Sequence, residues 1–343
     1  MTAILPIRRA APDAAGVPWR THLTALGVAA AALLLLFRQD AADMVRIWIE
    51  SSTFNHCLLI VPIIAWLVWQ RRPQLRRLVP TAWAPGLLIV AAGALAWLLG
   101  QAGGVALARH LGLVVMLQGT VVACLGKAVA RGIAFPLFYA LFLVPAGEEI
   151  VPLMQTITAR MCMTLLALAG IPAHLEGVFI TTPSGAFEVA EACSGVKFLI
   201  AMLAYGALVA NLCFRSWRRR ILFMAAAVVI PVLANGIRAW ATIYVASLTD
   251  ADYATGFDHI LYGWIFFAIV IALLMAAGWP FFDRAANDPG FDPAALQEGN
   301  AVPTRPRRLG GMVAAAMAVA AIPLAWSHAL AAAGTEPLPA EIA

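Results

Sequence analysis

Residues 177–202, GVFITTPSGAFEVAEACSGVKFLIAM, divide into two unlike halves. The first half alternates apolar and polar residues on both sides of Pro183-Ser184-Gly185, which predicts a short β-hairpin. The second half, from Ser194 onward, is a run of helix-forming residues long enough to enter a bilayer. Cys193 therefore lies where a hairpin becomes a membrane helix, and a helix N-terminus favours a thiolate. The alternative is that Cys193 is a small hydrophobic residue in a packed corner.

The composition around this stretch is that of a membrane protein. Hydrophobic residues make up 62% of 343, charged residues only 12%, and the mean hydropathy is +0.85. A soluble domain has roughly 25% charged residues. We therefore predict an all-α, polytopic membrane bundle that carries one short periplasmic β-hairpin before the Cys193 helix. The net charge of +5 does not indicate a nucleic-acid partner, because the basic residues gather beside the apolar runs.

Nine apolar runs approach the length of about 20 residues that crosses a bilayer. They are 22–37, 55–70, 84–102, 104–126, 129–146, 194–214, 221–249, 260–281 and 309–332. Arg8, Arg9 and Arg20 precede the first run without a convincing cleavage site, which indicates a retained signal anchor. These runs predict a cytoplasmic N-terminal segment (1–21), a multi-spanning catalytic domain (22–281), a cytoplasmic linker (282–308) and a final helix with a short periplasmic tail (309–343).

The clusters of Lys and Arg between the runs orient the chain, because such clusters remain in the cytoplasm. The nine spans then alternate consistently, provided that 147–193 stays outside. Residues 150–171 are apolar enough to suggest a tenth span, but Gln155, Thr156, Thr158 and Arg160 make the first half polar. We interpret 150–171 as an amphipathic helix at the outer face or a re-entrant helix, with a tenth crossing as the alternative.

This topology brings three reactive residues from separate segments to the outer face. Cys193 precedes the sixth span, and His259 opens the eighth. Arg238 lies roughly 26 Å along the seventh span, at 1.5 Å per residue, and an ionisable residue inside a span is costly. A thiol, an imidazole and a guanidinium together suit acyl transfer. Snorkelling of Arg238 to the interface, and an interfacial histidine at 259, are the structural alternatives.

Several neighbours could support these three residues. Glu191 and Ser194 flank Cys193, and Asn235 shares a helix face with Arg238. Asp258 and Tyr262 lie beside His259 in the segment DHILYGW. His56 opens the second span on the same side of the membrane, where an interfacial structural histidine is again the alternative. The five cysteines form neither a disulfide framework nor a zinc pattern, and we expect no metal or cofactor.

Four segments of the chain resemble the exosortase/archaeosortase family, and within it the exosortase A branch. They are FNHCLLIVPIIAWLVWQRR (54–72), GIPAHLEGVFITTPSGAFEVAEACSGVKFLIA (170–201), IPVLANGIRAW (230–240) and GFDHILYGWIFF (256–267). The resemblance runs from about the second span to residue 281. Residues 283–343 extend beyond the core of the family, and 309–332 resembles the start of a periplasmic module that some relatives carry.

The resemblance implies a cysteine-type endopeptidase or transpeptidase of the bacterial inner membrane, with its active site facing the periplasm. In that family Cys193 matches the nucleophile, Arg238 the catalytic arginine and His259 the catalytic histidine. The substrates would be proteins with a C-terminal PEP-CTERM signal, which is a Pro-Glu-Pro-like motif, an apolar helix and a basic cluster. The acyl group would pass to an unknown acceptor nucleophile or to water, and such enzymes accompany exopolysaccharide assembly.

Two other classes of function remain as alternatives. A transporter for exopolysaccharide would carry polar residues at mid-membrane depth in several spans, and Asn235 alone fits that pattern. A non-catalytic component of exopolysaccharide assembly would not need the Cys193 thiol.

Overall fold

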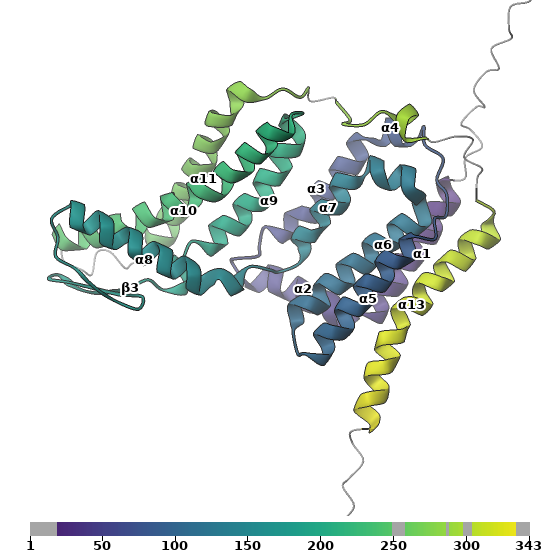
Figure 1. Cartoon of the computed structure of the whole chain (residues 1–343), viewed down its shortest axis with the longest axis horizontal. Helices are drawn as coiled ribbons and strands as arrows, with labels where there is room; N and C mark the ends of the chain where they lie inside the picture. The colour runs from purple at the N-terminus through teal and green to yellow at the C-terminus, as the bar shows by residue number, and fades with distance from the viewer. Residues whose placement is uncertain (1–18, 249–257, 286–287, 298–303, 334–343) are drawn as a thin grey trace, which may run out of the picture. The chain divides into compact units, whose positions relative to one another are not determined.

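The computed structural model describes residues 19–248, 258–285, 288–297 and 304–333, and the chain divides into two compact units (Figure 1). The first unit comprises residues 1–44, 62–144 and 289–343, and the second comprises 45–61 and 145–288. Each unit is built of helices, and the second also carries a small sheet. The predicted all-α membrane bundle with a β-hairpin before Cys193 is therefore confirmed.

The first unit is a bundle of helices from both ends of the chain. Its elements are α1 (Trp19–Leu36), α4 (Arg72–Leu75), α5 (Gly86–Ala102), α6 (Ala106–Gly132), α7 (Ala134–Tyr139), the 3-10 helix η2 (Ala140–Leu143), α12 (Pro293–Leu296) and α13 (Pro306–Ala333). Two further helices, α2 (Arg38–Glu50) and α3 (Cys57–Gln70), begin in one unit and end in the other. The C-terminal α13 packs against α1, α5 and α6.

Glycines that recur every seven residues allow α5 and α6 to pack backbone against backbone. They are Gly86, Gly93 and Gly100 on α5 and Gly112 and Gly119 on α6. A Cβ added at Gly93 would lie 2.7 Å from the Gly112 carbonyl oxygen, and one at Gly112 would lie 2.6 Å from the Gly93 carbonyl oxygen. A side chain at either of these positions would therefore clash with the opposite helix. Close van der Waals packing of this kind holds helices together in lipid, where apolar burial alone gives little net attraction.

Two carboxylates attach α2 to the first unit. Asp40, only 6% exposed, accepts a hydrogen bond of 2.8 Å from Trp97 Nε1 and lies 3.2 Å from Arg109 Nε. One turn later, Asp43 Oδ2 lies 3.1 Å from Nε2 of the buried His110. These pairs hold the amphipathic α2 against α5 and α6.

The second unit contains the segments with the candidate site residues. Its helices are the 3-10 helix η3 (Glu148–Ile150), α8 (Val151–Leu168), the 3-10 helix η4 (Glu191–Cys193), α9 (Val196–Cys213), α10 (Trp217–Leu248), α11 (Asp258–Gly278) and the 3-10 helix η6 (Trp279–Phe281). The long α10 packs against α8, α9 and α11. One buried core contains Met202 of α9, Phe214 directly after α9, Phe223 of α10 and Leu274 of α11.

The sheet of the second unit lies directly before Cys193. Strands β2 (Phe179–Thr182) and β3 (Gly185–Glu188) form the predicted hairpin about Pro183-Ser184, and β1 (His174–Glu176) adds a third antiparallel strand. Ile180 and Val189 are buried against Cys162 of α8 and Ile243 of α10. The alternating pattern in 177–189 thus reflects one packed face and one exposed face.

The helices match the predicted apolar runs, but only some are long enough to span a membrane by themselves. Six described helices meet that length, namely 19–36, 106–132, 148–168, 191–213, 217–248 and 306–327. The shorter apolar helices are 57–70, 86–102, 134–143 and 265–281. The predicted run 129–146 is thus shorter than expected, because α6 resumes after a break at Gly126 (φ 85°) and continues to Gly132.

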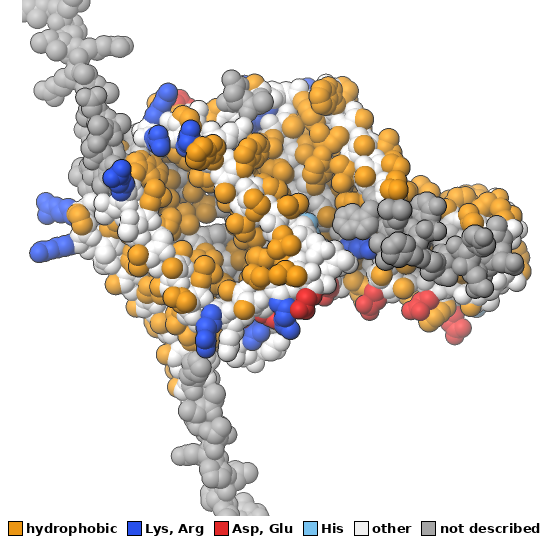
Figure 2. Space-filling view, turned by 180° about the vertical axis from the view of Figure 1, so that it is seen from behind, with side chains coloured by type: hydrophobic (Ala, Val, Ile, Leu, Met, Phe, Trp, Pro, Cys, Tyr) orange, Lys and Arg blue, Asp and Glu red, His pale blue; other side chains and the backbone are white. Residues whose placement is uncertain are grey.

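The surface of these helices is strongly apolar. Figure 2 shows hydrophobic side chains over much of the visible face of the described helices. Leu35, Leu88, Leu168, Leu222 and Leu248 are between 69% and 80% exposed. Exposed apolar surface of this extent is the expected lipid-facing surface of a polytopic protein.

The helix α8 forms most of residues 150–171, for which the sequence leaves open whether they cross the membrane. With η3 it is long and apolar enough to cross a membrane. Within the second unit, however, α8 lies across the end of α9 rather than alongside it (Figure 1). Glu148, Glu149 and Arg160 are exposed. This orientation favours the interfacial interpretation of 150–171, which stays a prediction.

The glycine contact between α5 and α6 predicts a sharp difference between two alanine substitutions. Gly112→Ala places a methyl group against the backbone of α5, and overpacking of this kind costs roughly 1–3 kcal/mol. Gly27→Ala in α1 is the matched control, because a Cβ there has nothing within 4 Å. We expect a lower thermal midpoint in detergent for Gly112→Ala and an unchanged or slightly higher one for Gly27→Ala. Equal midpoints for the two variants would contradict the packing described here.

Candidate active site

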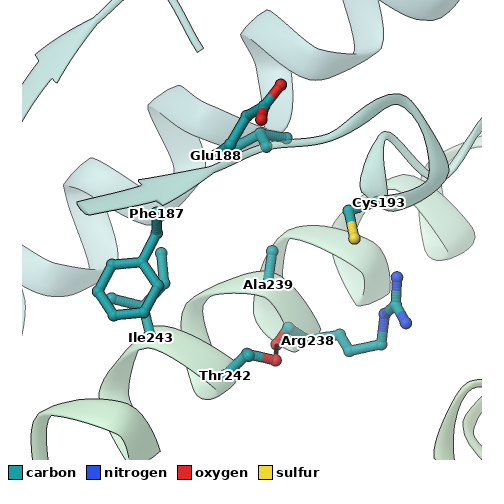
Figure 3. Close-up of a pocket in the computed structure, with 8 residues that line it drawn as sticks. Phe187, Glu188, Cys193, Arg238, Ala239, Thr242 and Ile243 are labelled. Carbon is teal, nitrogen blue, oxygen red and sulfur yellow. Dashed lines mark hydrogen bonds between the residues drawn. The ribbon is translucent and has the colours of Figure 1, made fainter. Parts of the chain in front are cut away.

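Cys193 and Arg238 line the same pocket in the second unit, which has a volume of about 80 Å³. The other lining residues are Phe187, Glu188, Val189, Ala239, Thr242 and Ile243. The Cys193 thiol and the Arg238 guanidinium point toward one another at one end, and Phe187 and Ile243 lie at the other (Figure 3). The pocket is therefore apolar along most of its length and reactive at one end.

A tight turn presents Cys193 to this pocket. Cys193 ends the 3-10 helix η4, where its N–H donates a 2.8 Å hydrogen bond to the Ala190 carbonyl. Gly195 follows with φ 85°, a conformation that favours glycine, and α9 begins only at Val196. Cys193 thus lies just before the membrane helix, whereas the sequence predicted a helix that continues from Ser194. The thiol is half-buried and belongs to no disulfide.

Arg238 extends from α10 toward the thiol and retains an unused hydrogen-bond donor. Its Nη2 donates a 3.3 Å hydrogen bond to Asn235 Oδ1, and its Cζ lies 5.6 Å from the centre of the Phe198 ring. Its Nε is buried and has no hydrogen-bond partner among the residues that the structure describes. The guanidinium itself lines the pocket beside the thiol, where its planar set of donors can bind a developing oxyanion.

Asn235 connects the segments on either side of the pocket. Its Nδ2 donates hydrogen bonds of 2.9 Å to the Cys193 carbonyl and 3.2 Å to Thr158 Oγ1. Thr158 in turn donates a 3.5 Å hydrogen bond to the Ser194 carbonyl. Asn235, Thr158 and Ser194 are each 1% exposed. The amide therefore belongs to the immediate surroundings of Cys193, as its position beside Arg238 in the sequence suggested.

The helix that contains His259, α11, passes close to the Arg238 guanidinium. A Cβ added at Gly263 of α11 would lie 3.7 Å from Arg238 Nη1, and Phe267 stacks on Phe198 at 4.8 Å between ring centres. Position 259 is one turn before Gly263 and two turns before Phe267, so all three share one face of α11. The side chains of Asp258, His259 and Tyr262 themselves lie outside the described residues.

The remaining predicted residues lie outside the pocket. Glu191 is exposed beside Cys193, and Ser194 Oγ accepts a 3.4 Å hydrogen bond from Val196 N. His56 Nδ1 lies 3.1 Å from the Thr53 carbonyl oxygen, and its Nε2 lies 3.8 Å from Cys57 Sγ. These contacts fit a structural histidine.

Two polar residues near Cys193 were not singled out in the sequence. Thr158 is buried against Asn235, and the half-buried Lys197 interacts electrostatically with both Cys193 and Arg238. Lys197 follows Cys193 by four residues at the start of an apolar run, which is a signal that could have identified it. Thr158 carries no such signal, because its role depends on a contact with α10, 77 residues away.

The donor set suits covalent acyl transfer. No group of three or more His, Cys, Asp or Glu side chains able to hold a metal ion occurs among the described residues. In an apolar pocket of this kind, the thiol can attack a carbonyl, and the guanidinium can stabilise the oxyanion that results.

Comparison with known proteins agrees with this chemistry. A family model described as transmembrane exosortase matches residues 48–276, a range that contains Cys193, Arg238 and His259. No curated protein and no solved structure matches the chain. The match covers more than half of the chain and includes the whole pocket. The chain therefore is a multi-pass membrane protein that belongs to the transmembrane exosortase family.

Proposed function

We propose that this protein cleaves C-terminal sorting signals of the PEP-CTERM type through a thioester on Cys193. The observation that carries the proposal is the pocket in which the Cys193 thiol faces the Arg238 guanidinium. Membership of the exosortase family supports a cysteine transpeptidase in general. The substrate class, the three catalytic roles and the acceptor belong to the proposal.

In the first half of the reaction, the Cys193 thiolate attacks the carbonyl carbon of the scissile peptide bond. The electron pair of the carbonyl moves to oxygen, and the oxyanion binds the Arg238 guanidinium, which lies beside the thiol in the pocket. When the tetrahedral intermediate collapses, the C–N bond breaks and the leaving amine takes a proton from His259. The product is a thioester between the substrate and Cys193.

In the second half, an acceptor amine or a water molecule attacks the thioester carbonyl. His259 accepts the proton of the nucleophile, the C–S bond breaks, and the Cys193 thiolate is restored. Transfer to an amine gives transpeptidation, and transfer to water gives hydrolysis. Neither half of the reaction consumes a redox equivalent or a nucleotide.

The lining of the pocket suits a substrate that approaches through the bilayer. Phe187, Val189 and Ile243 provide apolar surface next to Cys193. The sorting signal would place its apolar helix in the membrane and its scissile bond near the headgroups, where the sheet ends and α9 begins. We further propose that this face of the second unit is periplasmic, with the inner membrane as the location and exopolysaccharide assembly as the biological setting.

The role of Cys193 predicts loss of processing without loss of protein. Cys193→Ala and Cys193→Ser should both abolish cleavage of a co-expressed substrate that carries the Pro-Glu-Pro motif, apolar helix and basic cluster. A serine hydroxyl has no comparable ionised fraction near neutral pH, so it does not replace the thiol. The control is Cys213→Ala, because Cys213 lies on α9 outside the pocket. Normal cleavage by either Cys193 variant would favour a transporter or a non-catalytic assembly component.

Arg238→Lys separates oxyanion binding from snorkelling. Lysine keeps the charge and similar reach but lacks the rigid planar set of donors. Loss of such a donor typically costs about 10²–10³ in rate, so we expect cleavage to slow by at least about a hundredfold at normal protein levels. The exposed Arg160→Lys serves as the control and should leave the rate unchanged. Wild-type turnover by Arg238→Lys would assign the residue to interfacial anchoring.

Single-cysteine labelling tests the orientation and the course of α8. In cells, a membrane-impermeant maleimide should label Cys193 from the periplasm in a variant that keeps no other cysteine. A thiol introduced by Ser216→Cys, beyond α9, should react only after the membrane is permeabilised. Glu149→Cys, in η3 directly before α8, should behave like Cys193 if α8 lies at the interface. Labelling of Glu149→Cys together with Ser216→Cys would show that α8 crosses the membrane.

A further inference from the structure

The amide of Asn235 is the point at which three segments of the second unit meet. It lies on α10, yet it bonds to the backbone of Cys193 and to a side chain of α8. The same amide accepts a hydrogen bond from Arg238 one turn later on its own helix. The Asn235 side chain thus contacts both the backbone of Cys193 and the guanidinium of Arg238.

Hydrogen bonding determines the orientation of this amide. Its Oδ1 faces Arg238 Nη2, which can only donate, and its Nδ2 faces the Cys193 carbonyl, which can only accept. A flipped amide would oppose donor to donor and acceptor to acceptor. Both N–H groups are used, because the second donates to Thr158 Oγ1.

The backbone around Asn235 is shaped to admit it. Gly195 has φ 85°, and a Cβ there would lie 2.7 Å from Asn235 Cγ. On the other side, a Cβ at Gly236 would lie 2.8 Å from Met161 Sδ, so glycine also lets α8 approach α10. The two glycines make room for the amide between the Cys193 turn and α8.

We propose that Asn235 is the positioning residue of the active site, which fixes the backbone of Cys193 and the guanidinium of Arg238 relative to each other. This inference rests on the proposed function, and it assigns the residue a role that acts through Cys193 and Arg238 rather than on substrate. A buried amide with every donor and acceptor used is rigid, because each displacement breaks a hydrogen bond that water does not replace. Thr158 on α8 holds the second N–H and completes the arrangement.

The shape of aspartate makes it the most informative replacement. Asn235→Asp keeps the volume and the acceptor toward Arg238, but it removes both donors and places an oxygen against the Cys193 carbonyl. The new carboxylate would also pair with the Arg238 guanidinium and reduce the positive charge available to the thiolate. Binding of the apolar signal helix should not change, because Asn235 does not line the pocket.

The experiment uses the purified full-length protein in detergent and two measurements. The first is the rate at which N-ethylmaleimide alkylates Cys193 at one pH, read by peptide mass spectrometry. The second is kcat and KM for a synthetic peptide with a Pro-Glu-Pro motif and an apolar C-terminal segment. For Asn235→Asp we expect the alkylation rate to fall at least about tenfold, because less positive charge then stabilises the Cys193 thiolate. We expect kcat to fall at least about tenfold with KM little changed, since a 1 Å misplacement of a reacting group can lower a catalytic rate about a hundredfold.

Two pairs of variants control for folding. Asn211→Asp makes the same change at another buried asparagine of the second unit, beside Arg284 and outside the pocket, and should leave both measurements unchanged. Thr158→Val removes the hydroxyl that accepts a hydrogen bond from Asn235, and it should lower kcat by a smaller factor than Asn235→Asp does. Thr164→Val is its control on α8, since that hydroxyl donates to the Arg160 carbonyl.

The two measurements distinguish this inference from the proposed function. Alkylation needs no substrate, so it tests the positioning of Cys193 even if the wild-type protein fails to cleave the peptide, which would overturn the proposed function alone. Wild-type alkylation and kcat in Asn235→Asp would overturn the positioning role. A fall no larger than in Asn211→Asp, or a loss confined to KM, would overturn it equally.

Discussion

A polar side chain buried in a membrane protein must find all its partners within the protein, because the bilayer core supplies no water. The amide of Asn235 meets this requirement by joining α8, α10 and the turn that carries Cys193. An unsatisfied amide would cost several kcal/mol in an apolar environment, so the three segments are stabilised in one arrangement. The reactive end of the pocket is thus built from the same hydrogen bonds that hold the second unit together.

The two units use different means of holding helices together. In the first unit, glycines at every seventh position bring the backbones of α5 and α6 into contact. In the second unit, glycines serve a polar contact, since Gly195 and Gly236 leave the space that Asn235 and α8 occupy. Close packing alone gives a stable helix pair, whereas hydrogen bonds specify one register.

The apolar surroundings of the pocket matter for reactivity as well as for stability. Arg238 and Lys197 both lie near the Phe198 ring and near Cys193. In a site of low dielectric constant, such cations act more strongly on a thiolate or an oxyanion than they would in water.

The sequence by itself determined the apolar runs, the hairpin before Cys193 and the shared membrane face of Cys193 and Arg238, because hydropathy, periodicity and the alternation of spans are local or additive properties. It could not determine that Asp40 of α2 pairs with Trp97 and Arg109, because those two residues lie on other helices. The tertiary structure alone decided that Asn235 bonds to the Cys193 carbonyl, 42 residues away, and to Thr158 on α8. Such contacts depend on the angles and distances at which helices cross, and these follow from the packing of many side chains at once.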